Sequence, residues 1–203
     1  MKQPLYILTL LAALLVSCNE SEEAGEFDNW QERNRHYVDS IAHLADTGAD
    51  GWTKIVAFDL SDEAENAAPD NSHYVYVQKT AQGTGTASPH FADSVRVHYL
   101  GRLIPTATYA QGYVFGKSYS TYTLNEATDV PALLAVSQNV DGFATALMHM
   151  VEGDACRIVI PSYLGYGASP AASGSVPAHS TLIFDVKLAR IYRYGIDTDT
   201  TWH

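Results

Sequence analysis

The sequence predicts an α+β protein in which an antiparallel β-sheet wraps around one short helix, with a helical extension before the sheet. Three observations carry this prediction. Short runs rich in Val, Ile, Tyr and Phe recur through the second half of the chain, as expected for strands. One helical pattern interrupts them and closes at Gly153. A longer helical pattern precedes most of these runs, with apolar residues spaced for a single helix face. Several strands around one helix favour an α+β domain.

The first 17 residues predict a bacterial signal peptide. Lys2 precedes an apolar run that ends at Val16, and this run is shorter than the roughly 20 residues that span a bilayer as a helix. The run leads into Leu-Val-Ser-Cys18, which resembles the lipobox of bacterial lipoproteins. We therefore expect Cys18 to be lipidated and to hold the chain on the membrane. An ordinary cleaved signal with an incidental Cys18 is the alternative.

Residues 18–27 form a polar, acidic segment without hydrophobic periodicity, which we interpret as a tether. Acidic stretches behind a lipidated cysteine resemble the surface-export signals of Bacteroidetes lipoproteins, and a solvated linker is the simpler alternative. The expected location is the bacterial cell envelope, lipid-anchored at the outer membrane and facing the periplasm or the cell surface.

Residues 28–73 predict a helical extension followed by an acidic loop. Asp28 and Asn29 can cap a helix that Gly48 ends. Its apolar face consists of Trp30, Tyr37, Ile41, Leu44 and Ala45. This face can pack on the chain's own domain or on a second copy of the helix in a dimer. Residues 52–60 predict an early strand before the loop.

Residues 74–194 predict the main domain. Strands are expected at 74–77, 94–99, 156–160 and 182–188, and Phe143, Leu147, Met150 and Val151 mark the short helix. Residues 195–203 are a C-terminal tail.

Composition and motifs exclude several functions. The chain has 46% hydrophobic and 17% charged residues and a net charge of -11, which argues against a nucleic-acid partner. The eight histidines form no HExxH and the two cysteines no CxxC, so no metal or other cofactor is expected. No GxSxG motif marks a nucleophile. Cys156 lies in an apolar run and is expected to pack as a small buried hydrophobe.

Three ordered blocks resemble the FKBP-type peptidyl-prolyl cis-trans isomerases, or immunophilins. Residues 95–103 are similar to the family's V-x-V-x-Y-x-G-x-L strand, and residues 140–150 to its V-I-x-G-W-x-x-A-L-x-x-M helix. Residues 158–167 and 176–186 are similar to its P-x-x-x-x-Y-G loop and I-P-x-x-x-x-L-x-F-x-V strand. Together they extend the resemblance from residue 74 to about 192.

The resemblance implies a pocket and a role for each residue in it. Tyr99, Phe115 and Phe184 would be aromatic walls and Phe143 the floor. Tyr166 would donate a hydrogen bond from its hydroxyl, and Val140 from its backbone amide. Val176 would complete the substrate-binding set.

Elementary chemistry agrees with this activity. Rotation of an X–Pro bond faces a barrier of about 18–20 kcal/mol set by amide resonance. A dry aromatic cleft favours the twisted, less polar amide, so no acid, base, metal or cofactor is required.

The chain also departs from the family pattern. Gly116 stands where the family's F-D-S signature has a pocket aspartate, which predicts a weaker isomerase. Phe143 replaces a tryptophan, and residues 130–136 contain no aromatic. The connection 104–114 is longer than usual, and its Tyr109 and Tyr113 are expected to reshape one rim.

The leading hypothesis is therefore a prolyl isomerase and folding helper acting on exposed X–Pro segments of envelope or secreted proteins. A non-catalytic FKBP-like lipoprotein that binds a peptide or protein is the alternative. An assembly subunit that dimerises through the N-terminal helix is a third reading.

Overall fold

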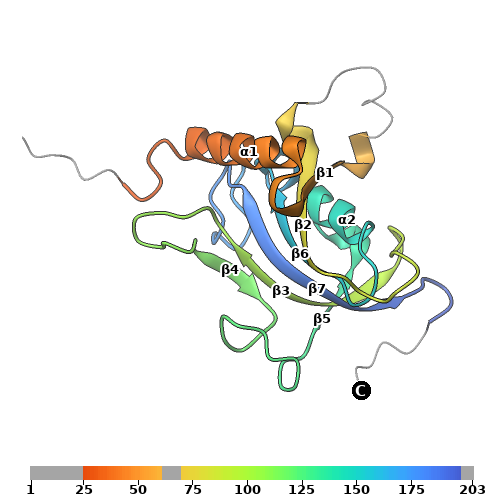
Figure 1. The fold of residues 1–203 in the computed structure, drawn as a ribbon. Helices are drawn as coiled ribbons and strands as arrows, with labels where there is room; N and C mark the ends of the chain where they lie inside the picture. The colour runs from red at the N-terminus through yellow and green to blue at the C-terminus, as the bar shows by residue number, and fades with distance from the viewer. Residues whose placement is uncertain (1–24, 61–69, 198–203) are drawn as a thin grey trace, which may run out of the picture.

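The computed structural model describes residues 25–60 and 70–197 (Figure 1). The predicted signal peptide, Cys18 and most of the tether lie outside the described residues. So do residues 61–69 of the acidic loop and the last six residues of the tail.

A single antiparallel sheet of seven strands forms the centre of the protein (Figure 1). The strand order is β1-β2-β6-β7-β3-β4, and β5 pairs with β3 beside β4. The strands are β1 (Trp52–Val56), β2 (Tyr74–Ala81), β3 (Ser94–Arg102), β4 (Val114–Lys117), β5 (Ala132–Ala135), β6 (Ala155–Ile160) and β7 (Leu182–Tyr192). The sheet with its two α-helices confirms the predicted fold class.

The sequence pattern predicted the long strands and missed two short ones. β2, β3 and β7 begin at their expected residues and run further than expected, while β6 begins one residue earlier and ends at Ile160 as expected. β4 and β5 have four residues each, too few for alternation to stand out. β1 ends at Val56, and a short 3-10 turn, Phe58–Leu60, follows it.

The helix α2 (Asp141–Leu147) packs on the face of the sheet that carries the candidate site. Phe143 of α2 contacts Phe184 of β7, with ring centroids 4.7 Å apart. Ile158 pairs with Phe184 and has the same orientation, and it is fully buried. Because side chains alternate along a strand, Val159 and Ile183 point to the opposite face.

The helix α1 (Trp30–Thr47) covers that opposite face (Figure 1). Lys54 of β1 bonds Asp46 of α1 at 2.5 Å, and its cross-strand partner Tyr76 is buried. The helix ends at Gly48 as predicted, and the Gly48 amide donates to the carbonyls of Leu44 and Ala45. Asn29 occupies the N-cap position without a side-chain cap, so the predicted capping interaction does not form.

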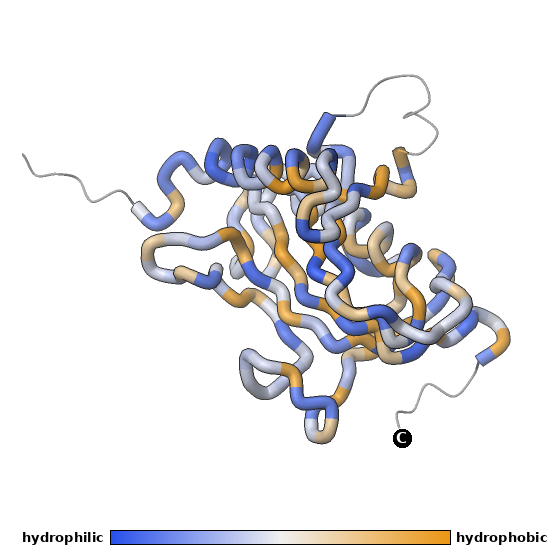
Figure 2. Tube along the Cα trace, viewed as in Figure 1, coloured by the Kyte–Doolittle hydropathy of each residue, from blue (hydrophilic) through white to orange (hydrophobic). Residues whose placement is uncertain are grey.

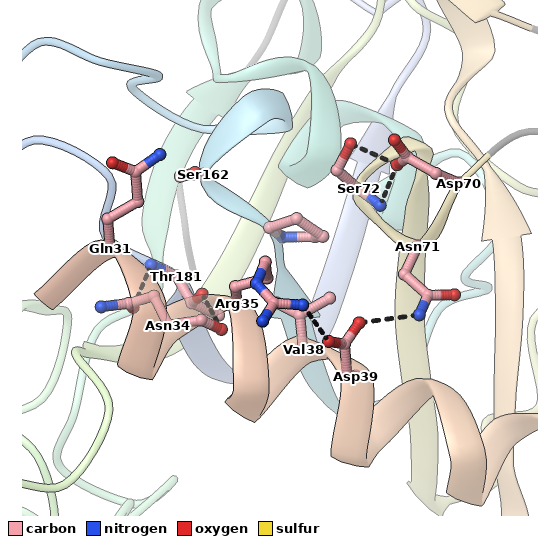
Figure 3. Close-up of a pocket in the computed structure, with 11 residues that line it drawn as sticks. Gln31, Asn34, Arg35, Val38, Asp39, Asp70, Asn71, Ser72, Ser162 and Thr181 are labelled. Carbon is pink, nitrogen blue, oxygen red and sulfur yellow. Dashed lines mark hydrogen bonds and ion pairs between the residues drawn. The ribbon is translucent and has the colours of Figure 1, made fainter. Parts of the chain in front are cut away.

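The apolar stripe of α1 is buried against the chain's own sheet. Its buried positions are Trp30, Asn34, Val38, Ile41 and Ala42, and Tyr37, Leu44 and Ala45 are partly buried. The indole of Trp30 donates to Ser180 Oγ at 2.9 Å, and the amide of Thr181 donates to Asn34 Oδ1 at 2.7 Å. Figure 3 shows this second contact together with the bond from Asn71 to Asp39. The stripe is thus occupied within one chain, and the predicted dimer stays untested.

Hydropathy follows this arrangement. Apolar residues lie along the strands, while much of α1 is hydrophilic (Figure 2). Within residues 25–60 and 70–197, no helix combines the length and hydropathy needed to cross a membrane. Cys156 is buried as predicted, and burial raises the pKa of its thiol to about 11.

Candidate active site

Three strands present aromatic rings to the α2 face of the sheet. Tyr99 comes from β3, Phe115 from β4 and Phe184 from β7. The Phe184 ring contacts the other two, with centroids 5.4 Å from Phe115 in an edge-to-face arrangement and 6.3 Å from Tyr99. Such geometries add attraction beyond the buried area. The three rings therefore form one connected wall.

Gly101 makes this wall possible. It lies directly opposite Phe184 in the β3–β7 pair and opposite Gly116 in the β3–β4 pair. A Cβ at residue 101 would meet carbons of the Phe115 and Phe184 rings at 2.7 Å. Only glycine lets both rings close over the strand.

The start of α2 supplies the floor. Phe143 is buried beneath Phe184. Val140, just before the helix, accepts hydrogen bonds at its carbonyl from the amides of Phe143 and Ala144. In the described part of the chain, nothing accepts a hydrogen bond from the Val140 amide itself. This N–H is therefore available to a carbonyl group bound in the pocket.

The loop between β6 and β7 forms the rim. Hydrogen bonds hold it, from the His179 amide to the Gly167 carbonyl at 2.8 Å and from the Ala171 amide to the Val176 carbonyl at 2.9 Å. Val176 is buried and packs inward, while Tyr166 is 43% exposed. The Tyr166 hydroxyl can thus reach a bound molecule.

These elements enclose a pocket of about 360 Å³. All seven residues singled out from the sequence line it: Tyr99, Phe115, Val140, Phe143, Tyr166, Val176 and Phe184. The structure brings them together, while their individual roles remain predictions. The other lining residues are Gly116, Leu134, Gln138, Asn139, Ser173, Ser175 and Leu182.

Leu134 was missed by sequence reasoning. It lies on β5, opposite Val95 of β3, and takes a place in the pocket wall where the expected aromatic is lacking. β5 was too short to be recognised, so no signal placed Leu134 at the site. Tyr109 and Tyr113 behave differently from expectation, because neither lines this pocket. They border a separate hollow beside Leu100 and Arg102.

Among residues 25–60 and 70–197, no charged side chain lines the pocket. The nearest carboxylate along β7 is Asp185, which points to the opposite face because side chains alternate. There it accepts hydrogen bonds from Arg102 at 2.6 Å and Arg157 at 2.7 Å. Among the residues that the structure describes, no cluster of three or more His, Cys, Asp or Glu side chains could hold a metal ion. The pocket offers apolar surface and hydrogen-bond donors.

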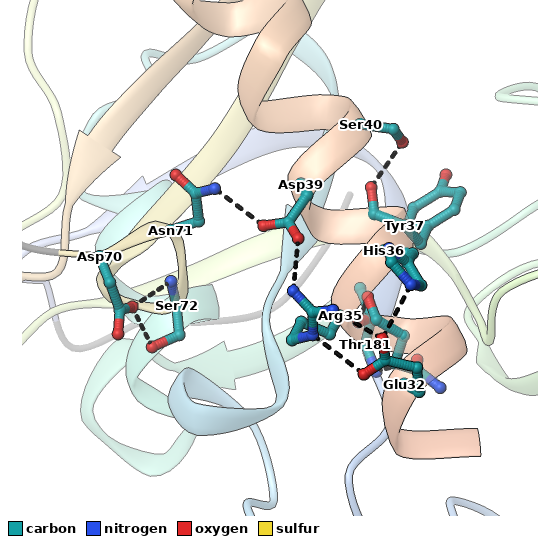
Figure 4. A network of polar contacts seen from close by, with 11 residues as sticks. Glu32, Arg35, His36, Tyr37, Asp39, Ser40, Asp70, Asn71, Ser72 and Thr181 are labelled. Carbon is teal, nitrogen blue, oxygen red and sulfur yellow. Dashed lines mark hydrogen bonds and ion pairs between the residues drawn. The ribbon is translucent and has the colours of Figure 1, made fainter. Parts of the chain in front are cut away.

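A second hollow of about 410 Å³ lies beside α1 and has a different character (Figure 3). Its polar side chains bond one another. Arg35 is held by Glu32 and Asp39, Asp39 also accepts from Asn71, and Asp70 accepts from Ser72 (Figure 4). Among them, the bond from Asn71 to Asp39 joins the helix to the rest of the chain, while the others lie within α1 or within the turn before β2.

An antiparallel sheet with one helix against an uncharged aromatic pocket defines the class of immunophilin-type prolyl isomerases. The family model described as FKBP-type peptidyl-prolyl cis-trans isomerase matches residues 85–189. The chain belongs to this family, which confirms the predicted enzyme class.

Three curated proteins are similar to this chain, and two of them are named as isomerases. The chain is 29% identical over 184 residues to a macrophage infectivity potentiator of Trypanosoma cruzi, covering 90% of this chain and 80% of that protein. It is 38% identical over 110 residues to the FKBP-type 22 kDa peptidyl-prolyl cis-trans isomerase of Escherichia coli (strain K12), covering 54% of this chain and 46% of that one. The isomerase FkpA of Aeromonas hydrophila is 31% identical over 122 residues, covering 60% of this chain and 40% of that one. The matches thus span less than half the length of the latter two relatives.

A solved structure shows the same fold. The crystal structure of a peptidyl-prolyl cis-trans isomerase from Pseudomonas syringae aligns with a TM-score of 0.56 at 20% identity, covering 82% of this chain and 96% of that chain.

Proposed function

We propose that this protein is a lipid-anchored peptidyl-prolyl isomerase that helps extracytoplasmic proteins fold by rotating X–Pro bonds in exposed segments. The observation that carries the proposal is the uncharged pocket of connected rings, in a chain of the FKBP family. Such a pocket suits the rotation of an amide bond, because this reaction transfers no proton and needs no acid or base.

The pocket lowers the barrier by the environment that it offers the amide. A planar amide is stabilised by charge separation, which water supports and an apolar site does not. The proline ring would lie on Phe143 and Phe184, away from water. The twisted amide has lost that charge separation and gains from the same surroundings. An acceleration of 10³–10⁶-fold requires roughly 4–8 kcal/mol of transition-state stabilisation.

Two donors would orient the substrate. The Val140 amide, which lacks an acceptor within the described residues, would bond a substrate carbonyl. The exposed Tyr166 hydroxyl would bond a second one from the rim. When these two donors hold the substrate carbonyls, one side of the X–Pro bond is fixed while the other side turns. This lowers the entropic cost of reaching the twisted amide.

A protease-coupled proline-isomer assay on the purified chain tests this proposal. We expect activity above buffer, a fall in kcat/KM for Tyr166→Phe and a larger fall for Phe184→Ala. Activity equal to buffer and unchanged in both variants would overturn the enzymatic assignment. Peptide binding without any turnover would instead identify the non-catalytic binding module.

The anchor is proposed from Cys18 and the segment around it. The test is fractionation of cells that express the chain or its Cys18→Ser variant. We expect the native chain in the membrane pellet after a carbonate wash and the variant in the supernatant. If both fractionate alike, Cys18 does not anchor the protein.

A further inference from the structure

A third hollow, of about 520 Å³, lies on the face of the sheet opposite the active-site pocket. Leu100 and Arg102 of β3 line it, and they alternate with Tyr99 and Gly101, which face the pocket. The rest of its wall comes from the long connection 104–114 and the loop after β4. We call it the tyrosine hollow, after Tyr109, Tyr113 and Tyr122.

Each tyrosine ring of the hollow has a neighbour that contacts it. The rings of Tyr109 and Tyr113 meet edge to face, with centroids 5.2 Å apart. A tight turn at Gly112 sets this contact, with the Gly112 amide donating to the Tyr109 carbonyl at 2.8 Å. Gly112 has a φ of +85°, and a Cβ there would lie 2.0 Å from the Leu103 carbonyl oxygen, so the turn requires glycine. The Lys117 ammonium lies 4.9 Å from the centre of the Tyr122 ring.

Hydrogen bonds with residues 26 and 33 hold the connection 104–114 in place. Arg33 of α1 donates to the Pro105 carbonyl at 3.3 Å and to the Glu26 carbonyl at 3.0 Å. The hydroxyl of Thr108 donates to the Glu26 carboxylate. Hydrogen bonds from the side chains of Thr106 and Thr108 hold the pKa of Glu26 below its ordinary value. The helical extension thus helps to build a second surface as well as packing on the sheet.

The rings remain open to solvent despite this support. Tyr109 is 43% exposed and Tyr122 is 72% exposed. Rigid exposed tyrosines provide contact area at a small cost in conformational entropy, as binding surfaces do.

We propose that the tyrosine hollow binds the residues flanking the isomerised proline, within the same polypeptide substrate and in an extended or polyproline II conformation. This proposal rests on the proposed isomerase function. Its main support is continuity along β4, since Val114 lines the hollow and the next two residues, Phe115 and Gly116, line the pocket.

The geometry allows one polypeptide to reach both sites. β4 is the last strand in the sheet order, so a chain can pass around its free edge from one face to the other. A sheet with its side chains is about 10 Å thick, which about three extended residues span at roughly 3.3 Å each.

The chemistry of the hollow fits such a segment. Polyproline II has no internal hydrogen bonds and docks in grooves lined by aromatic rings. The tyrosine hydroxyls and Gln111 can bond its free carbonyls. Arg102 is paired with Asp185, so the hollow does not select for a strongly acidic ligand.

The test compares two substrates in one isomerase assay on the full chain. One is a tetrapeptide with a single proline, and the other is a peptide of about twelve residues with the same central sequence, long enough to span both sites. The variant is the pair Tyr109→Ala and Tyr122→Ala. Tyr194→Ala is the matched control, because Tyr194 is 79% exposed and lies in neither hollow nor pocket.

We expect the double variant to lose about tenfold in kcat/KM on the long peptide, mainly through KM, with the tetrapeptide unchanged. The control should match the native chain on both. An equal loss on both peptides, or no loss on the long one, would overturn the proposal.

A direct binding measurement separates this proposal from the isomerase function. Fluorescence anisotropy follows binding of the labelled long peptide. If the native chain shows no turnover but the double variant still binds about tenfold more weakly, the hollow stands and the catalytic assignment fails. If the long peptide binds equally to the native chain and the double variant, the proposal is wrong. A shift of the Tyr109 and Tyr122 NMR signals on addition of an oligosaccharide would then show that the hollow binds another ligand.

Discussion

Replacing Gly116 with aspartate measures how much the reaction loses when the pocket has no carboxylate. The backbone accepts the change, because Gly116 lies in β4 and is not among the residues with positive φ. A Cβ at this position would lie 3.5 Å from Tyr99 Cε2 and 3.7 Å from the Tyr99 hydroxyl oxygen. These are ordinary contacts, so the Cβ of a new side chain fits without displacing the ring.

The expected gain follows from that distance. An aspartate oxygen extends beyond its Cβ and comes within hydrogen-bonding reach of the Tyr99 hydroxyl. A hydrogen bond to a charged group contributes about 1.5–3 kcal/mol. Only the part that is stronger in the transition state accelerates the reaction. Taking this part as about 1 kcal/mol, kcat/KM should rise about fivefold, since 1.36 kcal/mol corresponds to tenfold.

The assay is the protease-coupled measurement, run on Gly116→Asp beside Gly116→Ala and Gly116→Asn. The alanine variant reports the effect of losing glycine, and the asparagine variant reports the shape without the charge. We expect only the aspartate variant to gain activity. An unchanged or lower kcat/KM in a folded Gly116→Asp variant would refute the reasoning. Activity that appears in an inactive but peptide-binding parent would identify a binding module.

Three further predictions concern packing and stability. Gly101→Ala places a methyl 2.7 Å from the Phe184 ring, so it should lower the free energy of unfolding in urea by about 1–3 kcal/mol and also lower kcat/KM. Gly116→Ala, at the glycine that faces Gly101, should do neither. Trp30→Phe removes the 2.9 Å hydrogen bond to Ser180, and a double-mutant cycle with Ser180→Ala should give a coupling energy of about 1 kcal/mol. A coupling energy near zero would show that this hydrogen bond does not help to hold α1 on the domain. Burial pushes the pKa of Asp154 upward, but hydrogen bonds from two backbone amides and a lysine outweigh it and hold that pKa below its ordinary value. This stabilisation is therefore present above the unfolded-state pKa of about 4 and lost as pH falls through the lower folded-state pKa, so Asp154→Asn should flatten the acid side of a urea-midpoint profile.

The pocket residues could be predicted from the sequence because several lie in patterned segments and all match the motif order of one family. Tyr99 and Phe184 belong to alternating apolar runs, and Phe143 begins a clear helical repeat. Their order along the chain matched one family, and the structure gathers them in one pocket. Leu134 escaped notice because β5 has only four residues, and nothing local tells that it faces the same space as Tyr99.

The amino-acid sequence by itself determined the four longest strands, the single helix between them and, through its resemblance to the FKBP family, the aromatic nature of the site. The strands and the helix depend on local periodicity and residue type, which a short window of sequence carries. Only the tertiary structure decided on which face each side chain lies. Cross-strand pairing brings Gly101 against Phe184, and the turn at Gly112 sends Tyr109 and Tyr113 to the far side of β3 instead of to the pocket rim. Register and turn geometry are set by contacts between distant segments, and a change of one residue in register would move every side chain to the other face.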